Sequence, residues 1–236
     1  MHRRTLPPAA ALMPFRGLVL KRSPLVSPAI KAHIQAGFYE KHEIEYALTH
    51  MHYEDVVLEL GSGIGALSAV LLTHYISPAR YIALEANASL VALARENHRL
   101  NNIGRCEFVC GVATHERGRE DYDFYISRNF WASSLSPMPD CVAVVRVKAL
   151  RFNDLVRMYR PTFLICDIEG GEYSLLTHEA DLAPIRKLCL EVHNADAAKL
   201  AGLFDTLQAK GFCLKAGKRA STGVVFFEKD LPATPT

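Results

Sequence analysis

Short apolar runs alternate with helix-like segments along most of this 236-residue chain, and this alternation constrains its fold more than any other feature. A short apolar run indicates a buried strand, whereas apolar residues three and four apart indicate a helix. We expect strands at residues 55–61, 80–86, 106–113, 163–169, 187–193, 212–217 and 223–229. We expect helices at residues 29–51 with a break near Gly37, and at 64–76, 89–104, 171–182 and 195–211. The pattern predicts an α/β fold, with a mostly parallel sheet and helices on both faces.

The chain is long enough for one substantial core, and half of its residues are apolar. Residues 1–32 differ from the rest, because they hold six Lys or Arg, five Pro and no acid. We therefore expect a basic, Pro-rich N-terminal arm over residues 1–32, more a mobile lead-in than a docking segment. A single domain should follow over residues 33–236. We expect residues 114–140 to be irregular and functional, because long structureless segments inside a domain usually are.

Several classes of protein are excluded by the composition. No apolar run reaches the roughly 20 residues that span a bilayer. The six cysteines are dispersed and show no zinc spacing, so we expect reduced, mostly buried thiols. Two prolines interrupt the short apolar region of residues 1–15, which argues against a signal peptide. These observations predict a cytoplasmic protein.

A glycine-rich turn follows the first predicted strand of the sheet, in the sequence ELGSGIGAL at residues 59–67. Gly61, Gly63 and Gly65 allow a tight turn and a close approach of a ligand to the backbone. Their spacing also suits a dinucleotide. Glu59 argues against that ligand, because its carboxylate would repel a pyrophosphate. The same carboxylate suits the ammonium and sulfonium groups of S-adenosylmethionine, so we expect this cofactor.

Glu85 ends the next predicted strand, where a carboxylate can accept hydrogen bonds from both ribose hydroxyls. This role is shared with NAD proteins, so Glu85 supports a nucleoside ligand without separating the two cofactors. A P-loop is excluded, because no Gly-Lys-Ser/Thr follows the glycines.

Three carboxylates crowd into the stretch DIEGGEYSLL, which follows the apolar run FLIC. We expect Asp167 to face the cofactor's methionyl end or the acceptor, and Glu169 to face the acceptor. Glu172 either lies on the substrate side or is a helix-start charge. His193 ends the neighbouring strand and has the pKa of a general base. The four side chains could together hold a divalent cation such as Mg²⁺, but we expect no metal.

These motifs resemble, in order, those of the FkbM family of class I S-adenosylmethionine-dependent methyltransferases. The resemblance covers roughly residues 37–229. It rests on the stretches FYEKHEIEYAL, VLELGSGIG, ALEANASLVALARENHRLNN, WASSL, ICDIEGGEYSLL and LCLEVH. It implies a Rossmann-like class I methyltransferase fold with a seven-stranded sheet, and methyl transfer to oxygen of a small-molecule or sugar-containing acceptor. The implied cofactor residues are Glu59, Gly61, Gly63, Gly65, Glu85, Ala86, Val112 and Asp167.

The acceptor pocket should lie under the segment YISRNFWASSL at residues 125–135. There Trp131 can pack on a sugar ring, and Ser133 or Ser134 can hydrogen-bond it, although the aromatic side chains also suit a core. Tyr39 and Glu40 should close the pocket from the other side.

Other functions stay open on the sequence alone. The basic arm, with Arg and Lys residues between 146 and 160, suits a protein or RNA methyltransferase, and a non-catalytic S-adenosylmethionine-binding module is a third reading. The Asn/Asp-Pro-Pro-Tyr/Phe motif of amino-methylating enzymes is absent, which argues against methylation of a nucleic-acid base. We expect no nucleic acid partner, and the chain is compatible with a homodimer.

Overall fold

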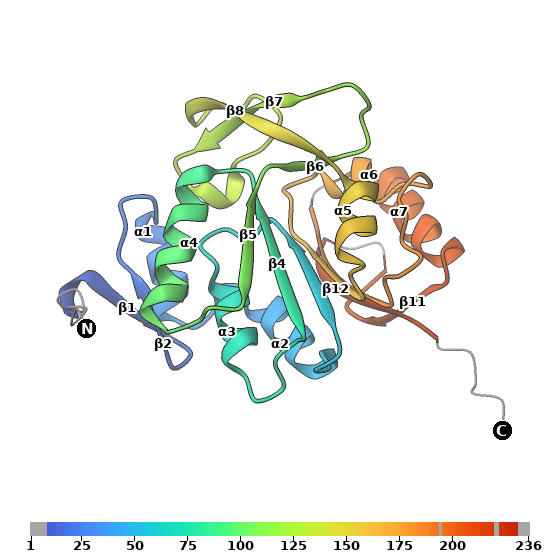
Figure 1. Cartoon of the computed structure of the whole chain (residues 1–236). Helices are drawn as coiled ribbons and strands as arrows, with labels where there is room; N and C mark the ends of the chain where they lie inside the picture. Colours follow the sequence, from blue (N-terminus) through green and yellow to red (C-terminus); the bar gives the residue numbers. More distant parts are fainter. Residues whose placement is uncertain (1–8, 194, 220–221, 231–236) are drawn as a thin grey trace.

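The computed structural model describes residues 9–193, 195–219 and 222–230. Its centre is a seven-stranded sheet in the order β11-β12-β10-β9-β3-β4-β5 (Figure 1). The strands are β3 (Val56–Leu60), β4 (Arg80–Glu85), β5 (Cys106–Cys110), β9 (Phe163–Cys166), β10 (Lys187–Val192), β11 (Phe212–Ala216) and β12 (Gly223–Lys229). Only β12 runs against its neighbours. The predicted, mostly parallel sheet is thereby confirmed.

Helices cover both faces of this sheet, as predicted. The side chains of β9 alternate, so that Phe163 and Ile165 join one hydrophobic cluster while Leu164 and Cys166 join the other. Helices α1–α4 contribute to the first cluster and α5–α7 to the second. The helices are α1 (Pro28–Gln35), α2 (Lys41–His50), α3 (Ala66–Thr73), α4 (Ala88–Leu100), α5 (Phe152–Tyr159), α6 (Glu172–Leu175) and α7 (Ala197–Ala209). None of the described helices is long and apolar enough to cross a membrane.

The described part of the expected N-terminal arm is packed onto the domain. After a 3₁₀ turn, η1 (Ala9–Ala11), it forms a hairpin of β1 (Leu12–Phe15) and β2 (Leu18–Lys21). The hairpin buries three apolar side chains in the same cluster as the sheet. Asn97 of α4 and Asn101, which caps α4, accept backbone hydrogen bonds from β2.

Helix α1 crosses the boundary that we expected at residue 32, and Gly37, with φ +73°, separates it from α2. Apolar side chains at alternating positions therefore hold this segment in place despite its prolines and charges. Residues 1–8, which include Arg3 and Arg4, lie outside the described residues.

The stretch 114–140, expected to be irregular, instead supplies a strand. A second sheet has the order β6-β8-β7, with β6 (Val112–Thr114), β7 (Asp121–Ser127) and β8 (Cys141–Arg151). The alternating sequence DYDFYIS of β7 pairs antiparallel with β8, and the 3₁₀ turn η2 (Phe130–Ala132) follows. Figure 1 shows this small sheet beyond the ends of β4 and β5.

The predicted helix at residues 171–182 is also wrong, because α6 is only one turn long. Asn153 of α5 takes the place of the helical hydrogen bonds further on. Its side chain donates to the carbonyl of Glu179 at 2.9 Å and accepts from the N–H of Asp181 at 2.8 Å. A tertiary contact therefore holds the segment beyond α6 in a non-helical path.

Candidate active site

A cavity of about 510 Å³ opens where β3, β4, β9 and β10 end. Ligands of open α/β sheets bind at the carboxyl ends of parallel strands, and this volume suits a small-molecule ligand. Thirteen of the sixteen predicted site residues line it: Tyr39, Glu40, Gly61, Gly63, Glu85, Ala86, Val112, Trp131, Ser133, Ser134, Asp167, Glu169 and His193. Glu59, Gly65 and Glu172 do not.

The glycine loop passes close to the strand that carries the acids. A Cβ atom on Gly61 would lie 1.7 Å from the backbone oxygen of Asp167, and the residue has φ +86°. Only glycine fits there, because both the space and the backbone conformation exclude a side chain. Gly65 has φ +70°, and its Cβ would lie 2.8 Å from the Cβ of Ala94 in α4. The first glycine therefore brings β3 against β9, and the last one brings α4 against the loop.

Glu85 is held in place by two backbone groups. Its Oε2 accepts from the N–H of Gly63 at 2.9 Å, and its Oε1 accepts from the N–H of Asn87 at 2.8 Å. Burial raises the pKa of Glu85 to about 7. Each carboxylate oxygen can accept a second hydrogen bond, so Glu85 has capacity left for a ribose diol.

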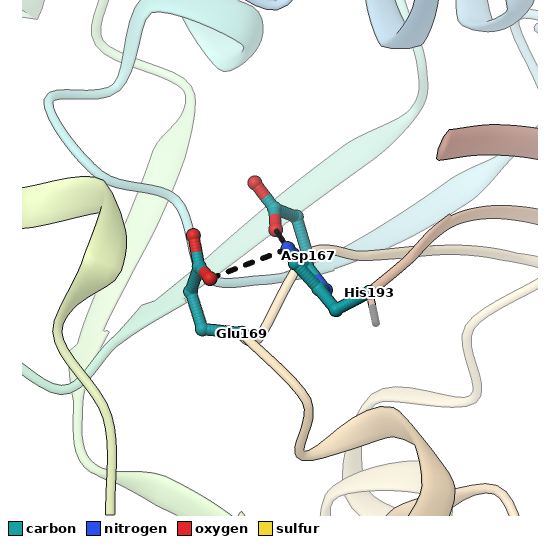
Figure 2. A group of neighbouring side chains, drawn as sticks. All are labelled: Asp167, Glu169 and His193. Atoms are coloured by element: carbon teal, nitrogen blue, oxygen red, sulfur yellow. Dashed lines mark ion pairs between the residues drawn. The ribbon is translucent and has the colours of Figure 1, made fainter. Parts of the chain in front are cut away.

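Asp167, Glu169 and His193 meet in the cavity (Figure 2). The His193 Nε2 atom lies 3.5 Å from Asp167 Oδ1 and 3.4 Å from Glu169 Oε2. Burial, followed by the charge of Glu191, raises the pKa of Asp167 well above its ordinary value. Burial also raises the pKa of Glu169 to about 7. A group that brings positive charge to this end of the cavity would stabilise both carboxylates.

Glu172 lies behind His193 rather than in the cavity. It is fully buried, and its Oε1 accepts from the backbone N–H of His193 at 2.8 Å and lies 3.3 Å from Nδ1. Burial alone would raise the pKa of Glu172, but its contacts with His193 bring the pKa below its ordinary value. Burial alone would lower the pKa of His193, but Glu172 and Glu169 raise it overall. Glu172 thus orients the imidazole so that Nε2 faces the acids.

Asp167, Glu169 and His193 could also present one ligand atom each to a metal ion, since these atoms lie within 4.8 Å of one another. A protonated His193 supplies positive charge to the same two carboxylates without an ion. Our expectation that no metal is needed stays a prediction.

Glu59 lies beneath the glycine loop. It is 2% exposed, and burial raises its pKa to about 8. Its predicted contact with the cofactor stays a prediction, because its side chain does not line the cavity.

Tyr39 and Glu40 lie against the glycine loop. A Cβ atom on Gly63 would lie 3.2 Å from the Tyr39 hydroxyl and 4.0 Å from Glu40 Oε1. Glu40 Oε2 is buried and has no hydrogen-bond partner among the described residues. Burial, followed by the charge of Glu59, raises the pKa of Glu40 well above its ordinary value. This pair therefore borders the predicted cofactor site as well as the acceptor side.

Trp131 lines the cavity and contacts His33 edge to face, with ring centroids 5.3 Å apart. The serine hydroxyls nearby bond to the backbone of their own loop. Ser133 Oγ accepts from the N–H of Ser127 at 3.0 Å, and Ser134 Oγ accepts from the N–H of Ser136 at 3.0 Å. They shape the loop, and their contact with an acceptor stays a prediction.

Glu43 is a cavity residue that the sequence reading did not single out. It lies on the buried side of α2, beside Ile44 and Ala47, and is 7% exposed. Burial raises its pKa to about 7, and the charge of Glu191 on β10 adds to this effect. The available signal was an acid on the apolar side of an amphipathic helix.

Residues 57–147 match the family model described as a methyltransferase domain. No curated protein matches the chain significantly.

Solved structures similar in fold include Trm5b from Pyrococcus abyssi, with 12% identity, coverage of 92% of this chain and 55% of that one, and a TM-score of 0.50. A methyltransferase from Pyrococcus furiosus shows 15% identity over 80% and 82% of the two chains, with a TM-score of 0.45. TYW2 from M. jannaschii, solved in complex with AdoMet, shows 15% identity over 93% and 86%, with a TM-score of 0.46.

The matched methyltransferase domain contains the glycine loop, Glu85 and Val112. The cavity adds what S-adenosylmethionine requires: a glycine-rich loop that allows close approach, an oriented carboxylate for the ribose, and buried acids for the positive end. The predicted cofactor and enzyme class are therefore confirmed, and the chain is an S-adenosylmethionine-dependent methyltransferase.

Proposed function

We propose that this S-adenosylmethionine-dependent methyltransferase methylates an oxygen of a small-molecule or sugar-containing acceptor. The proposal is carried by His193, whose Nε2 faces the cavity between Asp167 and Glu169 at 3.5 and 3.4 Å. A hydroxyl has a high pKa and needs a base close to its proton, and an imidazole suits this task. The motifs around these three residues also support membership of the FkbM family.

When bound, the cofactor would supply an electrophilic methyl group on its sulfonium, and a neutral thioether would be the leaving group. Nε2 of His193 accepts the proton of the acceptor hydroxyl while the oxygen–methyl bond forms and the sulfur–methyl bond breaks. Asp167 and Glu169 stabilise the imidazolium that results, and buried Glu172 fixes the ring through the backbone N–H and Nδ1. Alignment of acceptor, methyl and sulfur gives the remaining acceleration.

The charge of the cavity favours a neutral acceptor over a polyanion. The acids Glu40, Glu43, Asp167, Glu169 and Glu191 all line it. Three of the five basic residues between 146 and 160 that were considered for RNA docking have acidic partners: Arg146 pairs with Asp121 and Asp123, and Arg151 and Arg157 share Asp154. A phosphate backbone would therefore meet repulsion at the site without a clear basic path towards it.

A screen of hydroxylated small molecules and glycosides with labelled S-adenosylmethionine tests this proposal. On the acceptor found, His193→Ala should lower kcat by about 10²–10⁴-fold. Its cofactor affinity, measured by calorimetry, should stay close to that of the wild type. Asp167→Asn should lower kcat as well. The control is His178→Ala, an exposed histidine outside the cavity, which should leave kcat unchanged.

The pH profile tests the role of His193 separately. The imidazole must be neutral to accept a proton, and its pKa is raised above the ordinary value of 6.5. The rate should therefore rise as the pH passes through that raised pKa, and His193→Ala should remove this limb. Full turnover in both His193→Ala and Asp167→Asn would overturn the assignment.

A further inference from the structure

Strand β8 has an open edge although it lies in the middle of its sheet. It pairs with β7 from Cys141 onward, whereas β6 pairs with it only at residues 149–151. In the part of the chain that the structure describes, no strand pairs with this edge before Ala149. Residues 142–146 are all exposed, which is unusual for a central strand.

The backbone N–H and C=O groups of alternate residues along this edge point outward. Tyr125 of β7 exchanges two backbone hydrogen bonds with Ser134, at 2.9 and 3.1 Å, so its polar groups point away from β8. Val144 is the cross-strand partner of Tyr125. In antiparallel pairs that do not bond to each other, both residues turn their backbone groups outward. Val144, and with it Arg146, therefore presents its N–H and C=O to the open edge.

The side chains along the edge are apolar. Val142 and Val144 are 54% and 53% exposed, and Val145 is 36% exposed. Leu135, on the neighbouring loop, is 40% exposed. A long, exposed, apolar edge of this kind is a template for pairing with another strand.

We propose that the open edge of β8 pairs antiparallel with the same edge of a second copy, about a two-fold axis at Val144. The centre follows from the free part of β8, residues 141–148, because pairing must stop before Ala149, where the pairing with β6 begins. Of the residues that turn their backbone groups outward, Val144 lies nearest the middle of this part. The register is self-complementary, because Val142 of each copy lies opposite Arg146 of the other. Asp140 precedes β8, and its carboxylate already accepts a hydrogen bond from the Ser127 hydroxyl at 2.5 Å.

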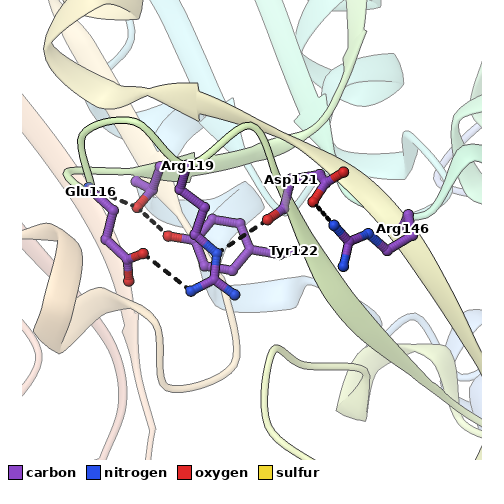
Figure 3. A network of polar contacts seen from close by, with 6 residues as sticks. Glu116, Arg119, Asp121, Tyr122 and Arg146 are labelled. Atoms are coloured by element: carbon purple, nitrogen blue, oxygen red, sulfur yellow. Dashed lines mark hydrogen bonds and ion pairs between the residues drawn. The ribbon is translucent and has the colours of Figure 1, made fainter.

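Arg146 does not oppose this pairing by its charge. Its guanidinium forms an ion pair with Asp121 (Figure 3) and a second one with Asp123, the latter at 3.2 Å. Its aliphatic stem is therefore presented to Val142 of the second copy beside a neutralised head group. An isologous contact of this kind closes as a dimer, because the same residues serve both copies.

The test is the mass of the full-length chain in solution, measured by light scattering over a range of concentrations. The wild type should be a dimer. Val144→Lys should be a monomer, because it sets two like charges face to face on the axis. The matched control Val144→Thr keeps a β-branched side chain and should stay dimeric. Calorimetric binding of S-adenosylmethionine shows that each variant is folded.

Cross-linking tests the register. In a Cys141→Ser background, Val144→Cys should form an intermolecular disulfide with itself, because hydrogen-bonded partners across the axis lie roughly 5.5 Å apart at Cα. Val142→Cys, which should face Arg146, should not form one. A wild type that is monomeric at every soluble concentration would overturn the proposal. A Val144→Lys variant that is still dimeric would also overturn the proposal. A dimer that forms only when a peptide strand is added would do the same.

Discussion

The glycines of the loop are required for different physical reasons. Gly61 is required by the close approach of the Asp167 backbone at the cavity. Gly65 does not line the cavity, and its neighbours are Ala94 and His98 of α4. The His98 ring is buried, and its Nε2 atom shares a hydrogen bond with Ser68 Oγ, 2.8 Å away. Gly65 is therefore a packing residue, although its spacing in the sequence matches a cofactor motif.

Gly65→Ala should lower the free energy of unfolding by about 1–3 kcal/mol, because a Cβ there clashes with Ala94 and the φ of +70° is strained. Urea unfolding measures this loss. The matched control is Gly104→Ala, where an added Cβ meets nothing within 4 Å, and which should be nearly neutral. The folded Gly65→Ala variant should still bind S-adenosylmethionine. Equal stability of the two variants would contradict this packing role.

At the scale of elements, one buried ion pair ties three parallel strands together at the end opposite the cavity. Asp55 precedes β3 and Lys187 begins β10, and their Oδ2 and Nζ atoms are 2.7 Å apart. The hydroxyl of Thr162, just before β9, donates to Asp55 Oδ1 at 2.8 Å and accepts from the N–H of Val56 at 3.1 Å. Both charged side chains are almost fully buried. The starts of β3, β9 and β10 are thus held in one register.

Asp55→Ala should cost about 3–5 kcal/mol of unfolding free energy, because it leaves the Lys187 ammonium buried and unpaired. Chemical denaturation measures the loss, and kcat of the folded fraction should not change. The control is Lys215→Ala, which removes an exposed ion pair with Asp230 and should leave stability near that of the wild type. A small effect of Asp55→Ala would mean that water reaches Lys187.

The elements that the sequence predicted well are those whose pattern is local. The strands of the large sheet are short apolar runs, and the α1–α2 break follows from Gly37. The one-turn length of α6 could not be predicted in the same way, because distant Asn153 holds the segment that follows it in a non-helical path. The packed N-terminal hairpin depends similarly on Asn97 of α4 and on Asn101, which caps that helix. Proline and charge content described the composition of that segment but not its contacts.

The candidate site residues whose place could be predicted from the sequence are those at the ends of strands. Asp167 and His193 follow the adjacent strands β9 and β10, and Glu85 ends β4 on the other side of β3, so their place on one cavity is a consequence of strand order. Glu43 could not be placed in the same way, because α2 reaches the cavity only through its packing on β10 and α3. The position of Glu172 behind His193 likewise depends on the course of a four-residue helix. Local sequence patterns therefore predict where the site lies. Tertiary packing decides which side chains reach the cavity and in which orientation.

At the scale of the whole molecule, the site concentrates acids that are costly to ionise together. The pKa of Glu59 is raised to about 8, and burial raises the pKa values of Glu43, Glu85 and Glu169 to about 7. The folded chain therefore holds protons that the unfolded chain loses near pH 4.5. A cationic ligand relieves the same repulsion, so cofactor binding and stability are linked through pH.

The unliganded protein should consequently lose stability as the pH rises from 6.5 to 8.5. In this window the carboxyls are already ionised in the unfolded chain and lose their protons only in the folded one, so the free energy of unfolding falls. His98, whose pKa is lowered to about 4, is neutral in the folded chain throughout this window, and in the unfolded chain it is partly protonated only near pH 6.5, so it opposes the fall only there. Within this window Glu59 alone could contribute about 2 kcal/mol, because its folded pKa of about 8 lies well above an ordinary value of 4.5. Urea unfolding at several pH values measures the slope, and Glu59→Gln should flatten it.

Saturating S-adenosylmethionine should stabilise the protein more at pH 8.5 than at 6.5, because its positive charge then meets ionised acids. A stability that rises across this window, or a slope unchanged in Glu59→Gln, would show that water or a bound cation already solvates these carboxylates.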